Sequence, residues 1–242
     1  MLPDEFAHFE LMDVASGFSD KERASLSQDY RDYCDYLASI GIRENFYIYK
    51  VMWDTSAKGV RFVHWKQDAW KAFNESGSLL TVLQRMWNST PLEAVRWSPP
   101  KIIVSQKHAK LYELLNDIGH SSELSVRFAD TPNVAAGVSF CTSTKDKIGK
   151  DKMLAAIGAA KVFHDQVLSA FQRASRRRIG LTETEEKYLE LVYRGHSRKA
   201  ICDYLKVSPN WVAKTFVNIR RKLDVSSDTE AMSRAIDLKI VG

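Results

Sequence analysis

The spacing of apolar residues predicts that the first part of the chain contains both helices and strands. Over residues 20–39 apolar side chains recur every three or four positions, which is the period of an amphipathic helix. The aromatic and β-branched segments 46–53 and 60–65 flank a turn-like stretch and predict a β-hairpin. Segments 123–129 and 134–142 predict two further strands.

Helical spacing recurs in three short segments, near 67–74, 79–88 and 106–118, and in a long one at 150–173. The stripe along the long segment is formed by Met153, Ile157, Ala160, His164, Val167 and Phe171. Residues 1–173 are therefore predicted to form an α-β-α sandwich, in which helices cover a small, mainly antiparallel sheet.

After residue 180 the chain shows only helical patterns. Residues 174–180 are basic and predict a short linker to an all-α domain at 181–242, so the fold class is α+β with a separate four-helix domain. Glu185 follows three residues after Thr182, which is the spacing of a capping box. The four helices are predicted to begin at the N-caps Thr182, Ser197, Ser208 and Asp228.

The third of these helices carries two distinct faces. Its inward stripe consists of Val212, Phe216, Ile219 and Leu223, at the spacing of one helix side. The outward face then consists of Ala213, Lys214, Val217, Asn218 and Arg221. Because an α-helix fits the major groove, and Asn and Lys can bond adenine and guanine edges, this face predicts a DNA-reading helix in a helix-turn-helix domain.

Further DNA contacts are expected from polar residues near this helix and at the starts of its neighbours, where free N–H groups favour phosphate. The additional residues expected at the DNA are Thr182, Arg198, Lys199, Thr215, Arg220 and Lys222. The competing interpretation is a helical lid with a solvated basic face.

Composition and charge agree with a folded DNA-binding protein. The chain has 242 residues, of which 45% are apolar and 27% charged, with a net charge of +5. Residues 176–222 contain twelve Lys or Arg and five Asp or Glu, a net charge of +7, so the remainder carries −2. Such asymmetry is typical of a nucleic-acid-binding module attached to a neutral body.

Other functional classes lack their residue patterns. Three scattered cysteines indicate reduced thiols in a cytoplasmic protein, and no Cys/His cluster has the spacing of a metal site. No catalytic triad or phosphate loop is visible, so we expect no enzyme and no required cofactor. No apolar run reaches membrane-spanning length, so we expect no membrane partner.

Residues 181–241 resemble the LuxR/GerE-type helix-turn-helix. The matching positions are Leu181-Thr182, Glu185, Gly195, Ile201, Leu205, Val207-Ser208, Val212, Asn218-Ile219 and Lys222-Leu223. Trp211 and Thr215 depart from the usual Thr and His. The resemblance implies a transcription regulator that binds double-stranded DNA, and two copies on a roughly palindromic operator would supply the usual specific affinity.

The order of elements before residue 173 is similar to the autoinducer-binding domain of quorum-sensing LuxR-type regulators, with local likeness at 89–91 and 136–140. The resemblance implies that Trp65 holds an acyl-homoserine lactone carbonyl, while the family's Asp is replaced by Ser78. The residues expected to line a cavity for this or another small apolar ligand are Tyr47, Tyr49, Trp53, Trp65, Trp70, Trp87 and Ser139. A filled core without a ligand is the alternative.

These observations lead to a hypothesis with two alternatives. The chain is expected to be a homodimeric LuxR-type regulator in quorum sensing, with weakened or absent lactone dependence. The alternatives are a lactone-responsive receptor and an antagonist that traps a related LuxR-type regulator in inactive heterodimers. RNA polymerase is a further expected partner. We expect the dimer to form on 150–173, through Phe163 and Val167, with a smaller contribution from 228–238.

Overall fold

The computed structural model describes residues 18–42, 44–51, 59–64, 71–72, 75, 94–97, 113, 120–128, 134–143 and 149–242. Within them the chain divides into two compact units. The N-terminal unit lies within residues 20–167, and the C-terminal unit comprises residues 168–242 together with Phe18 and Ser19.

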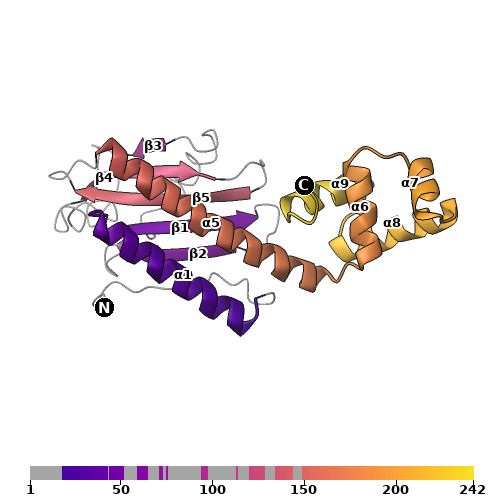
Figure 1. Ribbon diagram of the computed structural model, residues 1–242, viewed down its shortest axis with the longest axis horizontal. Helices are drawn as coiled ribbons and strands as arrows, with labels where there is room; N and C mark the ends of the chain where they lie inside the picture. The colour runs from indigo at the N-terminus through magenta and orange to yellow at the C-terminus, as the bar shows by residue number, and fades with distance from the viewer. Residues whose placement is uncertain are drawn as a thin grey trace. The chain divides into compact units, whose positions relative to one another are not determined.

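The N-terminal unit is built on an antiparallel sheet in the order β2-β1-β5-β4-β3 (Figure 1). Its strands are β1 (Glu44–Val51), β2 (Gly59–His64), β3 (Ala94–Trp97), β4 (His120–Arg127) and β5 (Val134–Ser143). The predicted hairpin is confirmed as β1–β2, and the two further predicted strands are β4 and β5.

Strand β3 was not predicted. It has four residues and lies between Pro91 and the pair Pro99-Pro100. A segment this short does not establish a two-residue period, and the prolines around it indicate a break. The helices expected near 67–74, 79–88 and 106–118 lie almost entirely outside the described residues.

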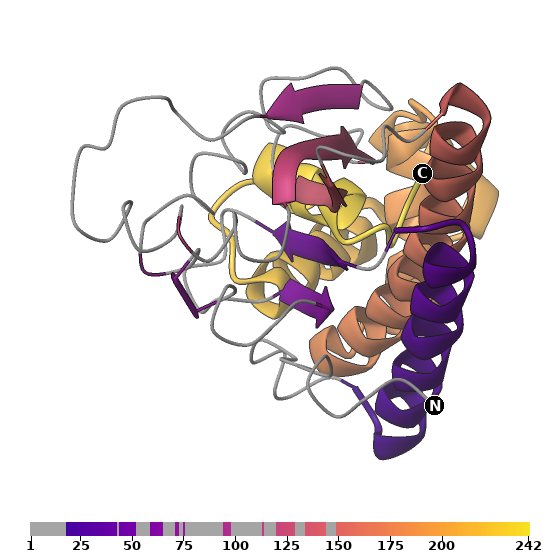
Figure 2. The same ribbon diagram turned by 90° about the vertical axis from the view of Figure 1, so that its left-hand side faces the viewer.

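Helix α1 (Asp20–Ser39) and the part of α5 (Lys150–Ile179) up to Val167 lie on one face of this sheet (Figure 2). An aromatic cluster joins them to it. The ring of Phe163 on α5 lies 5.3 Å from those of Tyr30 and Tyr33 on α1, and 5.1 Å from those of Tyr47 on β1 and Phe62 on β2. Edge-to-face and tilted pairs at this separation add specific attraction to the burial of apolar area.

This cluster corrects the prediction that Phe163 and Val167 form a dimer surface. Phe163 is 1% exposed and Val167 is fully buried within a single chain. The apolar stripe of the long helix is therefore used for the core of its own subunit. The last helix repeats this pattern, because Ala231 and Ala235 are buried, as is Leu238 at the C-cap.

Helix α5 is also longer than predicted. It continues through residues 174–179, which the sequence predicts to be most of a linker. No residue between Ala174 and Ile179 disfavours a helix strongly. Gly180 has a φ of +64°, a left-handed conformation that glycine adopts easily, and it follows the end of the helix.

The C-terminal unit contains the four predicted helices, α6 (Glu183–Tyr193), α7 (Arg198–Leu205), α8 (Pro209–Leu223) and α9 (Asp228–Asp237). Its core includes Tyr188 and Phe216, whose rings lie 5.2 Å apart. Among the described residues, no helix of the chain is long and apolar enough to cross a membrane.

The N-caps fix where these helices begin. The hydroxyls of Thr182, Ser197 and Ser208 accept hydrogen bonds from the backbone N–H three residues on, at 3.2–3.3 Å, as predicted. The prediction for the fourth helix is wrong by one residue, because Ser227 is the N-cap and accepts from Glu230 N–H at 3.1 Å. Asp228 is thereby left for another interaction, described below.

Candidate nucleic-acid interface

Helix α8 separates its buried and exposed residues as the sequence predicts. Val212, Phe216, Ile219 and Leu223 are buried, whereas Ala213, Lys214, Val217, Asn218 and Arg221 are all exposed. The Ser208 cap and Pro209 in the first turn fix the start of the helix. The result is one straight face of small, apolar, amide and cationic side chains directed at solvent.

Three polar residues of this face have no competing contacts. Within the described part of the chain, the side chains of Lys214, Asn218 and Arg221 make no hydrogen bond or ion pair. Lys199, exposed in the first turn of α7, is equally uncommitted among the described residues. These side chains can therefore bind an external partner without breaking an internal interaction.

Thr215 does not belong to this face. It is 6% exposed, and its hydroxyl donates a hydrogen bond of 3.0 Å to the carbonyl of Trp211, one turn earlier in α8. This position lies beside the buried Phe216 and turns toward the helix-packed side. In this structure Thr215 therefore has little surface to offer DNA, which differs from the exposed position that we predict for it.

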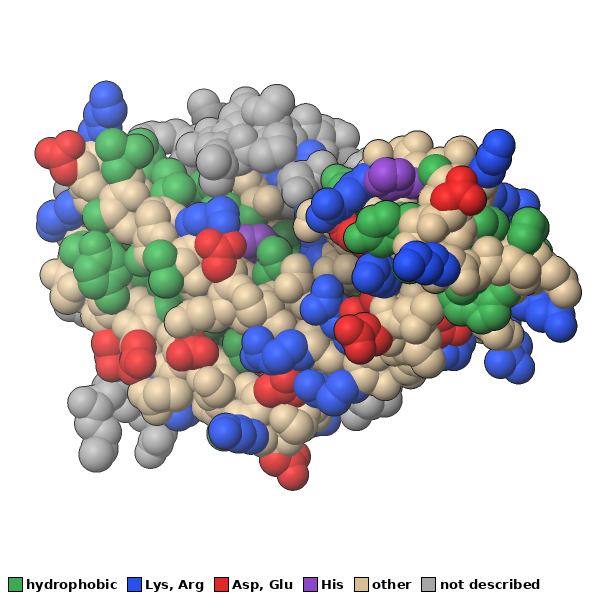
Figure 3. All heavy atoms as spheres, turned by 45° about the vertical axis from the view of Figure 1, so that its right-hand side comes forward, with side chains coloured by type: hydrophobic (Ala, Val, Ile, Leu, Met, Phe, Trp, Pro, Cys, Tyr) green, Lys and Arg blue, Asp and Glu red, His purple; other side chains and the backbone are tan. Residues whose placement is uncertain are grey.

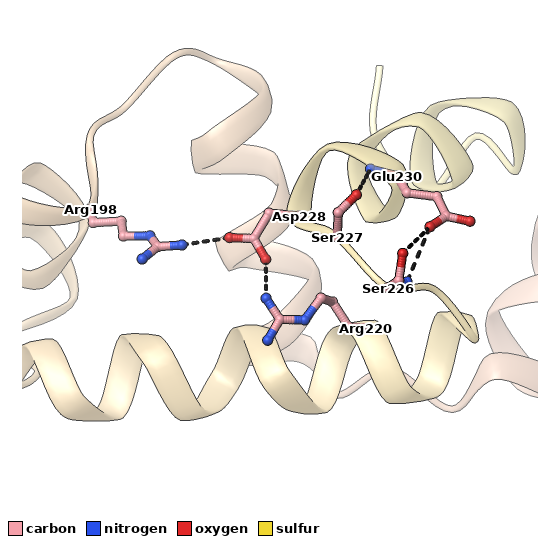
Figure 4. A network of polar contacts seen from close by, with 6 residues as sticks. All are labelled: Arg198, Arg220, Ser226, Ser227, Asp228 and Glu230. Atoms are coloured by element: carbon pink, nitrogen blue, oxygen red, sulfur yellow. Dashed lines mark hydrogen bonds and ion pairs between the residues drawn. The ribbon is translucent and has the colours of Figure 1, made fainter.

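Arg198 and Arg220 converge on one carboxylate. Arg198, in the first turn of α7, and Arg220, on α8, each donate to a different oxygen of Asp228 at the start of α9 (Figure 4). The side chain of Arg198 is still well exposed and keeps further N–H donors, whereas that of Arg220 is less than one-third exposed. Arg220 thus holds α9 against α8 and is a poorer phosphate ligand than we expected.

Lys222 is also used internally. Its ammonium group donates to the Gly180 carbonyl at 2.8 Å and to Glu185 Oε2 at 2.6 Å, while Glu185 accepts from the N–H of Thr182 in the capping box at 2.7 Å. Burial raises the pKa of Glu185, but the hydrogen bonds from Lys222 and Thr182 outweigh burial and leave that pKa below its usual value. Lys222 and Thr182 therefore fix the start of α6. Their contact with phosphates stays a prediction.

Cationic side chains are frequent on the C-terminal unit. Figure 3 shows many Lys and Arg side chains in blue on this unit, with acidic side chains in red among them. Several acidic side chains of this unit form ion pairs with its arginines and lysines, as Asp228 and Glu185 do. The uncompensated positive charge is the kind of surface that attracts a phosphate backbone.

The predicted ligand-lining residues that can be located do not share one face of the sheet. Tyr47 and Tyr49 are buried toward α5, where the Tyr47 hydroxyl and His164 Nδ1 form a hydrogen bond of 2.7 Å. The ring of Tyr49 lies 6.2 Å from that of His164. The two tyrosines pack between the sheet and α5, and their role in ligand binding stays a prediction.

Ser139 lies on the opposite face. It pairs with Phe46 in the strand register, one position away from the pairing of Tyr47 with Val138, and side chains alternate between faces along a strand. Its hydroxyl forms a buried hydrogen bond of 2.6 Å with that of Ser125 on β4. The other proposed ligand residues, Trp53, Trp65, Trp70 and Trp87, lie outside the described residues.

Sequence reasoning missed the contacts made by Asp228 and the Lys222–Glu185 pair. The ion-paired residues are separated by 8 to 37 positions, and no local pattern marks them. Among the residues that the structure describes, no three or more His, Cys, Asp or Glu side chains are grouped so that they could hold a metal ion.

Comparison with known proteins gives a family match for one segment of the chain and two solved structures with a similar fold. Residues 180–235 match the family model of the bacterial regulatory proteins of the luxR family. The structure of Escherichia coli SdiA has a TM-score of 0.56 and 12% identity, over 91% of this chain and 97% of that one. SdiA in complex with octanoyl-rac-glycerol has a TM-score of 0.57 and 14% identity, over 93% of this chain and 98% of that one. No curated protein sequence matches the chain.

Proposed function

We propose that this chain, whose C-terminal domain belongs to the luxR family of bacterial regulatory proteins, controls transcription as a homodimer that reads a specific, roughly palindromic DNA site through α8. The observation that carries the proposal is the solvent-facing row Ala213, Lys214, Val217, Asn218 and Arg221. Lys214 and Asn218 supply donors and an acceptor for base edges, and Arg221 at the end of the helix supplies a charge for phosphate.

Two alanine substitutions separate base reading from charge. Lys214→Ala should weaken binding to a selected operator by about 5- to 150-fold and binding to a scrambled duplex far less, because a base contact contributes only at the correct sequence. Arg221→Ala should weaken both and lower the slope of log affinity against log salt by about 1. Lys152→Ala, an exposed cation in the first turn of α5, is the matched control and should change neither.

Fluorescence anisotropy on both duplexes at several salt concentrations measures these quantities. Equal losses for Lys214→Ala on selected and scrambled DNA would remove α8 from base recognition. An effect of Lys152→Ala as large as that of Arg221→Ala would mean that total charge, and no defined face, accounts for binding.

Dimer formation is proposed on the exposed side of α5. Leu154 and Val162 are large apolar side chains that are exposed at 55% and 63%, and they lie eight residues apart on one side of the helix, with the exposed Gly158 between them. A dimer presents two recognition helices to two half-sites about one helical turn apart. Val162→Asp should yield a folded monomer in light scattering, and an unchanged dimer mass would exclude this face.

We further propose that folding and DNA binding do not require an acyl-homoserine lactone. Two features support this. The resemblance to quorum-sensing LuxR-type regulators implies a ligand-binding Asp at the position of Ser78. Tyr47 and Tyr49 are buried by packing against α5. A buried ligand N–H left without an acceptor costs roughly 1–3 kcal/mol, which would weaken lactone binding.

Thermal unfolding tests this part of the proposal. The protein is made in a host without lactone synthesis and melted with a panel of acyl-homoserine lactones and with octanoyl-rac-glycerol, the ligand present in the SdiA complex. A ligand that binds only the folded state adds about 2.7 kcal/mol of stability at a hundred times its dissociation constant. A cooperative transition that no ligand shifts is expected, and a rise with one lactone would establish a receptor instead.

A further inference from the structure

The base-reading face of α8 contains an exposed apolar side chain that neither folding nor charge explains. Val217 is 52% exposed. The exposed Ala213 lies four residues earlier, so the two form an apolar strip along the outward face. The strip is separate from the buried stripe of Val212, Phe216 and Ile219 on the other side of the same helix.

Val217 gives little to the stability of the domain at this position. A β-branched residue is a weaker helix former than Ala, Lys or Arg, and half of this side chain remains in water. Its surroundings on the helix surface are polar, with Lys214 three positions before it, Asn218 directly after it and Arg221 four positions after it. An apolar group at the centre of a polar surface that faces DNA would be complementary to an apolar group of the DNA.

The major groove offers one such feature. Among the four bases only thymine presents a methyl group there, on C5, and apolar side chains recognise it by direct contact. The side chain of Val217 ends in two methyl groups, and Ala213 has only one carbon beyond the backbone, so the helix can approach a base pair closely at this strip. The polar neighbours Lys214 and Asn218 remain free to bond the adjacent base pairs.

We propose that Val217 is a specificity-determining residue that contacts the C5 methyl group of a thymine in each half-site. The inference rests on the proposed function, because it assumes that α8 lies in the major groove. To that function it adds that the apolar part of the α8 face selects thymine.

The experiment uses the full-length protein and a duplex obtained by selection from a random library. Each thymine of the selected site is replaced in turn by deoxyuridine, which removes the methyl group and keeps every hydrogen-bonding edge. For the wild-type protein, replacing the contacted thymine of a half-site should weaken binding about four- to fifteenfold, as expected for losing the burial of one to two apolar carbons.

Two variants assign that loss to Val217. In Val217→Ala the same deoxyuridine replacement should have less than a twofold effect, since the two changes remove the same contact. Val217→Thr keeps a methyl group of similar position and should remain sensitive to the replacement. Because position 217 is exposed, both variants should fold, and circular dichroism confirms this before binding is measured.

The outcomes distinguish this inference from the function on which it rests. If the wild type binds the selected site but no thymine is sensitive to methyl removal, or if Val217→Ala keeps the full sensitivity, the thymine contact is wrong while DNA reading stands. If selection enriches no sequence and the protein binds all duplexes alike, the proposed function itself fails.

Discussion

Replacing Phe163 by alanine should strongly destabilise the N-terminal unit, because this ring joins α1, α5 and two strands. It is 1% exposed and lies 5.1–5.3 Å from four other aromatic rings. Truncating a buried Phe costs about 3–5 kcal/mol through lost burial and the cavity that remains. Total stabilities are about 5–15 kcal/mol, so much of the stability of this unit would be lost.

Urea unfolding followed by near-ultraviolet circular dichroism measures this loss. Gln166→Ala is the matched control, because it lies three residues further along the same helix and is exposed, so it should change the free energy of unfolding by at most about 0.5 kcal/mol. If Phe163→Ala lost less than 1 kcal/mol and converted a dimer into a monomer, the ring would belong to a subunit interface and the described core would be wrong.

Two further predictions concern groups whose pKa the fold changes. Because the pKa of Glu185 lies below its usual 4.5 in the folded state, its contribution is present above pH 4.5 and is lost as the pH falls through the lower folded value. Glu185→Gln should therefore lower the urea midpoint of the C-terminal unit at pH 7 and have little effect at pH 2, and an equal effect at both would contradict the Lys222 contact. Burial raises the pKa of Cys34 to about 12, so its thiol should react with iodoacetamide only on unfolding. Peptide mass spectrometry follows this labelling, and native labelling of Cys34 as fast as that of the partly exposed Cys202 would contradict the buried site.

Local patterns were sufficient to predict most of the described elements. Helix α1, the β1–β2 hairpin and the four C-terminal helices follow from apolar spacing and capping residues, which act over a few positions. Strand β3 was missed because four residues between prolines show no clear period.

The errors at the site arise from long-range geometry. The apolar stripe of α5 indicates burial but not whether the same subunit or a partner covers it, and the ring contacts of Phe163 decide this. Strand register places Tyr47 and Ser139 on opposite faces, which composition cannot show. The ion pairs of Asp228 with Arg198 and Arg220 join three helices, so their sequence positions carried no signal.

The central claim is that α8 reads DNA sequence through its exposed face. Its most direct test is the ratio of affinities for a selected and a scrambled duplex, measured at one physiological salt concentration for the wild type and for the double variant Lys214→Ala/Asn218→Ala. The wild-type ratio should exceed about a thousandfold and fall steeply in the variant, with scrambled binding reduced only slightly. A wild-type ratio near one, or a variant that keeps the full ratio, would contradict the account.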